Sequence, residues 1–203
     1  MKIICIGRNY MNHTKEMNSP LPKNPLFFMK PDTALLPKKN PFYYPNFTKD
    51  LHFECELVIK INKLGKNIAE KYAHEYYDHV GIGIDFTARD IQQKCKENGH
   101  PWEIAKAFEH AAPLGSHFLP LEGNDVQNIN FQLKKNGAVV QQDNSKNMIF
   151  SVDQIIAYVS QFMTLKIGDL IFTGTPAGVG PVQIGDQLEG YIESEHLLDL
   201  KIK

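Results

Sequence analysis

The chain has 203 residues, of which 22 are Lys or Arg and 23 are Asp or Glu, so its formal net charge is −1. This balance excludes the strongly basic composition that is typical of nucleic-acid-binding proteins. Hydrophobic residues make up 42% of the chain, which excludes an intrinsically disordered protein. A chain of this length can bury one core without a disulfide or a metal, so we expect residues 1–203 to form a single domain.

The sequence contains no feature typical of a membrane protein or of an oxidising compartment. Cys5, Cys55 and Cys95 are odd in number, widely spaced and without a Cys-x-x-Cys pair, which favours a reducing compartment. The apolar run at residues 3–6 is too short for a signal peptide, and no window approaches the roughly 18 apolar residues of a membrane span. We therefore expect a cytoplasmic protein that binds neither nucleic acid nor membranes.

In chain order, the first elements are short strands. Residues 3–6 form an apolar strand candidate, and residues 25–31 form a second one between two prolines. Along residues 51–61 polar and apolar side chains alternate, which predicts a strand with two different faces. A helix is expected from Asn67 to about Tyr77, and a strand at residues 80–84 follows it.

The second half combines helices with a hairpin. A helix is predicted from Phe86 to about Asn98, with Asp85 as its N-cap and Gly99 at its end. Asn136-Gly137 between two apolar runs predicts a hairpin with a type I′ turn. A capping box of Ser151 and Gln154 predicts the start of another helix. Because short strands outnumber helices, the sequence predicts an α+β fold that is mostly β.

Three carboxylates are candidate metal ligands. Glu54 and Glu56 are two residues apart in a predicted strand, so their side chains share a face. Such a pair alone is typical of a solvated strand face. Here the opposite face carries Phe53 and Leu57, and Asp85 also ends an apolar strand. Together the three carboxylates would form a hard, anionic site suited to Mg²⁺ or Mn²⁺, with coordination positions left for a substrate.

Six short motifs, in order along the chain, resemble the fumarylacetoacetate hydrolase (fumarylacetoacetase) family. They are GRNYMNH at 7–13, FMKP at 28–31, LHFECEL at 51–57, DFTARDIQ at 85–92, PWEIAK at 101–106 and TGTPAGVG at 173–180. The chain is most similar to the short branch of acylpyruvate hydrolases and oxaloacetate decarboxylases. The resemblance implies a mixed β-roll with a few peripheral helices, a divalent metal bound by Glu54, Glu56 and Asp85, and a homodimer.

The resemblance also implies residues that bind the substrate, a small 2-oxo acid. Arg89 and Gln92 are one helical turn apart, and Arg suits bidentate binding of a carboxylate. Without the resemblance, both would be assigned to an exposed helix face. Lys106 and Lys30 match family positions that contact substrate. In the glycine-rich segment 173–180, the hydroxyl of Thr175 is the side chain that we expect to contact the substrate.

His13 and Glu16 are three residues apart, which places them on one turn of a helix. A carboxylate next to an imidazole fixes its tautomer and orients it for proton transfer. In the enzymes that the chain resembles, such a pair activates water. Here that water would attack the distal keto carbon of an acylpyruvate, releasing a carboxylic acid and a pyruvate enolate that the metal stabilises. Taken alone, the two residues would be assigned to the surface.

Three hypotheses follow for the function. The leading one is a Mg²⁺- or Mn²⁺-dependent acylpyruvate hydrolase. The second keeps the site but replaces hydrolysis by decarboxylation or keto–enol isomerisation of oxaloacetate or a related 2-oxo diacid, which needs no attacking water. The third is a metabolite-binding or metal-binding protein without catalysis. Residues 31–50 form a long predicted loop that could cover the distal end of the substrate, so the acyl chain length stays open.

Overall fold

The computed structural model describes residues 1–17, 20–123 and 125–203. Its largest sheet has six strands in the order β2-β1-β10-β4-β5-β7. β1 and β10 are parallel, and the other neighbours are antiparallel. The strands are β1 (Ile3–Gly7), β2 (Leu26–Lys30), β4 (Cys55–Ile61), β5 (Tyr77–Ile84), β7 (Leu119–Pro120) and β10 (Leu170–Phe172). The first four residues of β1 are buried and Gly7 is half-buried, so this part of the sheet lies in the core.

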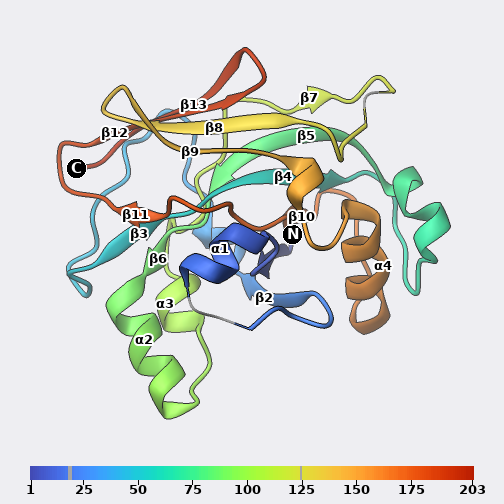
Figure 1. Ribbon diagram of the computed structural model, residues 1–203, viewed down its shortest axis with the longest axis horizontal. Helices are drawn as coiled ribbons and strands as arrows, with labels where there is room; N and C mark the ends of the chain where they lie inside the picture. The colour runs from blue at the N-terminus through green and yellow to red at the C-terminus, as the bar shows by residue number, and fades with distance from the viewer. Residues whose placement is uncertain (18–19, 124) are drawn as a thin grey trace.

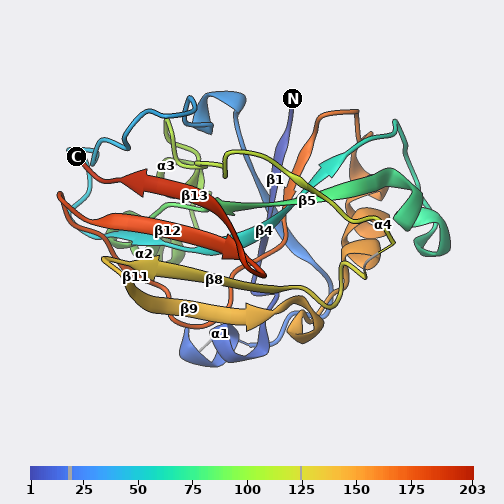
Figure 2. The same ribbon diagram turned by 90° about the horizontal axis from the view of Figure 1, so that it is seen from above.

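Two smaller antiparallel sheets complete the β structure. One has four strands in the order β13-β12-β8-β9 and covers β4 and β5 (Figures 1 and 2). Gly190 of β12 allows this close packing, because a Cβ there would lie 3.1 Å from Ile82 Cδ1 of β5. The other has three strands in the order β11-β3-β6. The strands are β3 (Leu51–Phe53), β6 (Thr87–Ala88), β8 (Asn130–Lys135), β9 (Ala138–Asn144), β11 (Gly180–Pro181), β12 (Gln187–Ile192) and β13 (Glu195–Lys201).

The helices are short and lie around the sheets. The α-helices are α1 (Met11–Glu16), α2 (Arg89–Asn98), α3 (Glu103–Lys106) and α4 (Val152–Phe162), and the 3₁₀ helices are Asp32–Ala34, Glu70–Tyr76 and Ser145–Asn147. Helices α2 and α3 lie side by side next to β6, and α4 lies at the other end of the molecule (Figure 1). The mostly β fold predicted from the sequence is confirmed. Among the described residues, no helix has the length and apolarity needed to cross a membrane.

Local turn and capping chemistry gave correct predictions. Asn136 and Gly137 have φ values of 52° and 81°, as a type I′ turn requires, and they join β8 to β9. Ser151 and Gln154 form the capping box of α4. Gly99 ends α2 with a φ of 65°.

Two helix starts were wrong. The expected helix at residues 67–77 is a 3₁₀ helix that begins at Glu70, because the backbone N–H groups of Asn67 and Ile68 are bonded to Ser160. Asp85 is not an N-cap: α2 begins at Arg89, after the short strand β6.

The predicted strand at residues 51–61 is interrupted at Glu54, and this break determines where the site lies. β3 and β4 belong to different sheets, and Glu54 is the residue between them. Their partners, β6 and β5, are likewise separated by Asp85 and Phe86. The Asp85 N–H donates to the Glu54 carbonyl, 2.8 Å away, at the crossing. Both carboxylates therefore lie where a pair of strands passes from one sheet to the next.

Candidate metal centre and active site

Three buried carboxylates converge at this crossing. Glu54 is 6% exposed, and Glu56 and Asp85 are each 1% exposed. One oxygen from each can be chosen so that all three lie within 4.8 Å of one another. Glu56 is the second residue of β4, so it shares a face with Glu54 as predicted.

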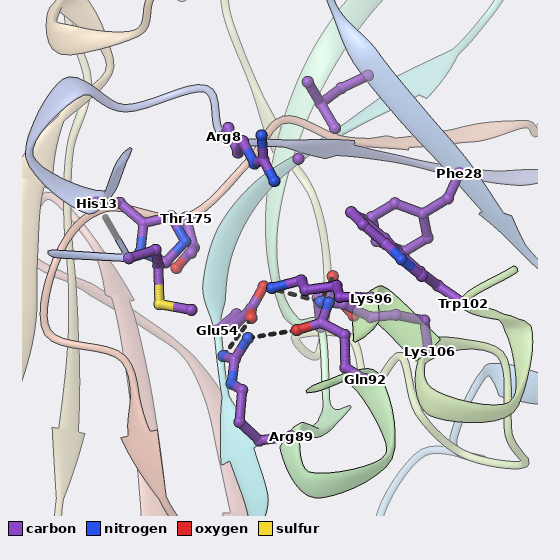
Figure 3. Close-up of a pocket in the computed structure, with 14 residues that line it drawn as sticks. Arg8, His13, Phe28, Glu54, Arg89, Gln92, Lys96, Trp102, Lys106 and Thr175 are labelled. Atoms are coloured by element: carbon purple, nitrogen blue, oxygen red, sulfur yellow. Dashed lines mark hydrogen bonds and ion pairs between the residues drawn. The ribbon is translucent and has the colours of Figure 1, made fainter. Parts of the chain in front are cut away.

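Three cationic side chains compensate the charge of these carboxylates. Lys106 Nζ donates to Glu54 Oε2 at 3.0 Å and to Asp85 Oδ2 at 2.7 Å. Arg89 donates to Glu54 Oε1 at 2.7 Å from the opposite side (Figure 3). Lys30 Nζ lies 2.7 Å from Asp85 Oδ1 as an ion pair. These contacts explain how three carboxylates can be buried together.

The two glutamates differ in their electrostatic surroundings. Burial opposes ionisation of Glu54, but Lys106 and Arg89 outweigh it and hold the pKa of Glu54 below its ordinary value. Burial and the neighbouring carboxylates of Asp85 and Glu54 raise the pKa of Glu56 well above its ordinary value, although the Gly174 N–H donates to its Oε2 at 2.7 Å. Glu56 thus lacks a cationic partner of the kind that Glu54 has.

The cluster fits a hard divalent cation. Its donors are carboxylate oxygens, the ligands that Mg²⁺ and Mn²⁺ prefer. Asp85 Oδ1 is buried and, despite its ion pair with Lys30, accepts no hydrogen bond from the described residues. A cation there would occupy this acceptor and lower the repulsion that Glu56 experiences.

The His13–Glu16 pair lies on α1, and His13 lines the same pocket as Glu54 and Asp85. His13 Nδ1 is 3.1 Å from Glu16 Oε2, as the three-residue spacing predicts. The Gly178 N–H, 3.1 Å from Glu16 Oε1, fixes the carboxylate from the other side. Because an ionised carboxylate only accepts hydrogen bonds, this contact requires the proton on Nδ1 and leaves Nε2 as the free acceptor of His13.

Comparison with protein families identifies the chain. Residues 2–201 match the model of the fumarylacetoacetate (FAA) hydrolase C-terminal family. The chain belongs to the fumarylacetoacetate hydrolase family. The family resemblance read from the six motifs is therefore confirmed.

Relatives in this family are enzymes. A mitochondrial oxaloacetate tautomerase of Bos taurus is 42% identical over 202 residues, covering 99% of this chain and 90% of the relative. The oxaloacetate tautomerase YcgM of Escherichia coli is 42% identical over 189 residues, covering 92% of this chain and 86% of the relative. A solved structure of fumarylpyruvate hydrolase from Pseudomonas aeruginosa, in complex with Mn²⁺ and pyruvate, superimposes with a TM-score of 0.93. It is 36% identical and covers 100% of this chain and 89% of that one.

The pocket above the carboxylates is small, with a cavity volume of about 40 Å³, and it is partly open to solvent. Most residues predicted from the family resemblance lie in its wall. They are His13, Glu54, Asp85, Arg89, Gln92, Lys106 and Thr175. Arg89 donates to Gln92 Oε1 at 2.8 Å, which confirms their proximity on α2.

Two predicted substrate contacts differ from expectation. Lys30 does not line the pocket: it is 2% exposed and lies behind Asp85, where it also donates to the carbonyls of Phe86 and Lys106. It therefore holds Asp85 rather than a substrate. Thr175 lines the pocket, but its hydroxyl proton is used by the Cys55 carbonyl, 2.8 Å away.

Other parts of the pocket wall were missed. The loop at residues 31–50 contributes no residue to it. Arg8, Phe28, Lys96 and Trp102 line it instead (Figure 3). Arg8, Phe28 and Trp102 fall within the family motifs, which was the available signal. Lys96 carried no signal, because a lysine on a polar helix is typical of a solvated face.

Proposed function

We propose that this chain is a divalent-metal-dependent enzyme that transfers a proton at C3 of a 2-oxo acid, interconverting its keto and enol forms. The observation that carries the proposal is the presence in one pocket of a buried carboxylate cluster and a histidine oriented by a carboxylate. The similarity to oxaloacetate tautomerases from two distant organisms supports oxaloacetate as the substrate to test. This is the isomerase alternative of the sequence hypotheses rather than the leading hydrolase.

Several polar side chains of the site have a role in this reaction. A Mg²⁺ or Mn²⁺ ion held by Glu54, Glu56 and Asp85 would supply a Lewis acid that polarises the 2-oxo group. Two of the three N–H groups of Lys106 Nζ donate to Glu54 and Asp85, which leaves the third for a substrate oxygen. Gln92 accepts from Arg89 through Oε1, so its amide nitrogen remains a donor to an anion.

His13 moves the proton. Its Nε2 is the free base of the ring, because Nδ1 is engaged with Glu16. In the keto-to-enol direction Nε2 removes the C3 proton and the 2-oxo oxygen takes up a proton; in the reverse direction the enol oxygen loses its proton and Nε2 returns a proton to C3. His13 is only 6% exposed, which limits competition from bulk water.

Hydrolysis of an acylpyruvate is a second candidate, supported by the same pair of residues. His13 Nε2 would remove a proton from water, and that water would attack the distal keto carbon. The bond between this carbon and C3 then breaks, and C3 takes up a proton to give pyruvate. The similarity to a fumarylpyruvate hydrolase structure favours testing this reaction as well.

Both reactions can be followed with one set of variants. Wild type with Mn²⁺ is expected to accelerate the loss of enol absorbance of oxaloacetate, and a chelator is expected to abolish the acceleration. Glu54→Ala and His13→Gln should each lower the rate by at least about 100-fold, whereas Glu75→Ala, which changes an exposed carboxylate outside the pocket, should not. Pyruvate release from acetylpyruvate tests the hydrolase. Full activity of Glu54→Ala, or no metal-dependent rate on either substrate, would refute the proposal.

The expected substrate class, the homodimer and the cytoplasmic location stay predictions. A small 2-oxo acid as the partner agrees with the proposed chemistry. Homodimerisation can be measured by analytical ultracentrifugation, and the cytoplasmic location by fractionation of the source cells.

A further inference from the structure

Arg8 enters the pocket from the end of β1, facing the carboxylate cluster (Figure 3). Its backbone is in the left-handed region, with a φ of 59°, which is uncommon for a residue other than glycine and carries a cost in free energy. The next residue explains how this conformation is held. Asn9 is fully buried, and its amide bonds the Phe150 N–H, the Phe150 carbonyl and the Thr173 carbonyl. The turn is thus fixed in the one conformation that directs Arg8 into the pocket.

The charge balance of the site leaves Arg8 without a counter-ion. The three buried carboxylates are equal in number to three cations, Lys30, Lys106 and Arg89, all of which are ion-paired with Glu54 or Asp85. Arg8 is partly buried, yet it forms no hydrogen bond or ion pair with any residue in the described part of the chain. The carboxylates at the floor of the pocket are thus accompanied by an equal number of cations, whereas the guanidinium of Arg8 on another wall has no counter-ion among the described residues.

Lys96 adds a second unmatched cation to the same pocket. It projects from α2, and its Nζ lies 5.8 Å from the centre of the Trp102 ring. It has no ion pair with any described residue. Partial burial and repulsion from the positive charges of Arg89 and Arg8 lower the pKa of Lys96. An anion between Arg8 and Lys96 would relieve this repulsion.

One part of the pocket wall is apolar. Phe28 and Trp102 line the pocket and pack edge to face, with ring centres 6.1 Å apart. Such a wall suits the carbon chain of a substrate rather than another charged group. The pocket therefore combines an acidic floor and two unmatched cations with an apolar part of its wall.

We propose that Arg8, together with Lys96, binds the distal carboxylate of a 2-oxo dicarboxylate and thereby selects diacids over monoacids. The inference rests on the proposed function, which places the 2-oxo acid end of the substrate at the carboxylate cluster. Arg8 supplies a planar fork that matches a carboxylate, and Lys96 supplies a point charge at the rim. Neither residue takes part in proton transfer.

The test compares two substrates that differ only at the distal end. Oxaloacetate and 2-oxobutanoate both have four carbons and hydrogens at C3, but 2-oxobutanoate ends in a methyl group. Enzyme-catalysed exchange of the C3 hydrogens with D₂O, followed by NMR with Mn²⁺ removed before detection, reports the same proton transfer for both. The ratio of kcat/KM for the diacid to that for the monoacid measures the selection. Rates without enzyme are subtracted for each substrate.

Arg8→Met is expected to lower this ratio by about 10- to 100-fold, the effect of losing a charge-assisted, bidentate contact. The monoacid rate should stay within about threefold of wild type, which also shows that the variant is folded. Arg8→Lys, which keeps the charge but loses the fork, should give an intermediate ratio. Lys96→Met should give a smaller loss, and Lys94→Met, an exposed lysine of the same helix outside the pocket, should give none.

The outcomes separate this inference from the proposed function. If wild type exchanges neither substrate, the proposed function is refuted and the inference falls with it. If wild type is active and Arg8→Met lowers both rates equally, or leaves the ratio unchanged, the proposed function stands and the role of Arg8 is refuted. Calorimetric binding of 2-oxoglutarate and 2-oxopentanoate, another pair that differs by one carboxylate, should show the same change in ratio.

Discussion

Replacing Lys106 by Met removes a cation that bridges two carboxylates of the cluster. Lys106 is 2% exposed and donates to both Glu54 and Asp85. Without it, three buried carboxylates share two cations, Lys30 and Arg89. Breaking a buried ion pair costs about 3–5 kcal/mol, because one charge is left uncompensated. For a chain of this length that free energy corresponds to a fall in Tm of roughly 6–20 °C.

A divalent cation should reverse much of this loss. In wild type the ion has to share its ligands with Lys106, whereas in Lys106→Met it restores the missing positive charge. Mn²⁺ is therefore expected to raise the Tm of Lys106→Met by more than that of wild type, as measured by circular dichroism with chelator and with Mn²⁺.

The control is Lys63→Met. Lys63 and Glu75 form an ion pair of 2.8 Å whose side chains are 52% and 46% exposed. This variant should unfold like wild type under both conditions, because exposed pairs contribute little. An unchanged Tm of Lys106→Met in chelator, or an equal gain from Mn²⁺ in variant and wild type, would refute the compensation argument.

Three further predictions concern the cluster and its supports. Glu56→Gln should weaken Mn²⁺ binding by at least about 100-fold in calorimetry, since even residues behind metal ligands contribute 10- to 100-fold. Gly174→Ala should lower the free energy of unfolding by about 2–4 kcal/mol in urea titrations, because φ is +99° and the new Cβ would lie 2.7 Å from Asn9 Cβ; Gly137→Ala, strained but unobstructed, should cost less. Asp169 is a buried carboxylate whose pKa burial alone would raise, but bonds from Lys2 and Lys166 hold it below its ordinary value. Its stabilisation is therefore present above about pH 4 and lost as the pH falls further, so Asp169→Asn should unfold with a shallower acid dependence than wild type.

Predictions that depended on local chemistry succeeded. The Asn136-Gly137 turn and the Ser151–Gln154 capping box involve only neighbouring residues, so nothing distant could override them. The three-residue spacing of His13 and Glu16 predicted their contact correctly for the same reason.

Predictions that depended on distant packing did not all succeed. Asp85 has the residue type and position of an N-cap, but its carboxylate is ion-paired with Lys30 and Lys106, from parts of the chain more than 20 residues away. The depth of Lys30 behind Asp85 could not be read from its sequence neighbours. Apart from its place in a family motif, Arg8 gave no signal as a site residue, because a lone arginine after a strand has no periodic pattern and its direction depends on the bonds of Asn9 to residues beyond 140.

The position of the site follows from the way the strands change sheets. At Glu54 the chain passes from the sheet of β3 to the sheet of β4. At the next residue, Cys55, the backbone N–H bonds a side chain instead of a neighbouring strand. Gln141 bridges this gap: its Oε1 accepts from the Cys55 N–H at 2.9 Å, and its amide nitrogen donates to Thr175 and Pro176. A side chain thus replaces the missing strand partner and ties the segment after β10 to the cluster. Because the same segment supplies the Gly174 N–H to Glu56, the crossing that exposes the carboxylates to the pocket also fixes their geometry.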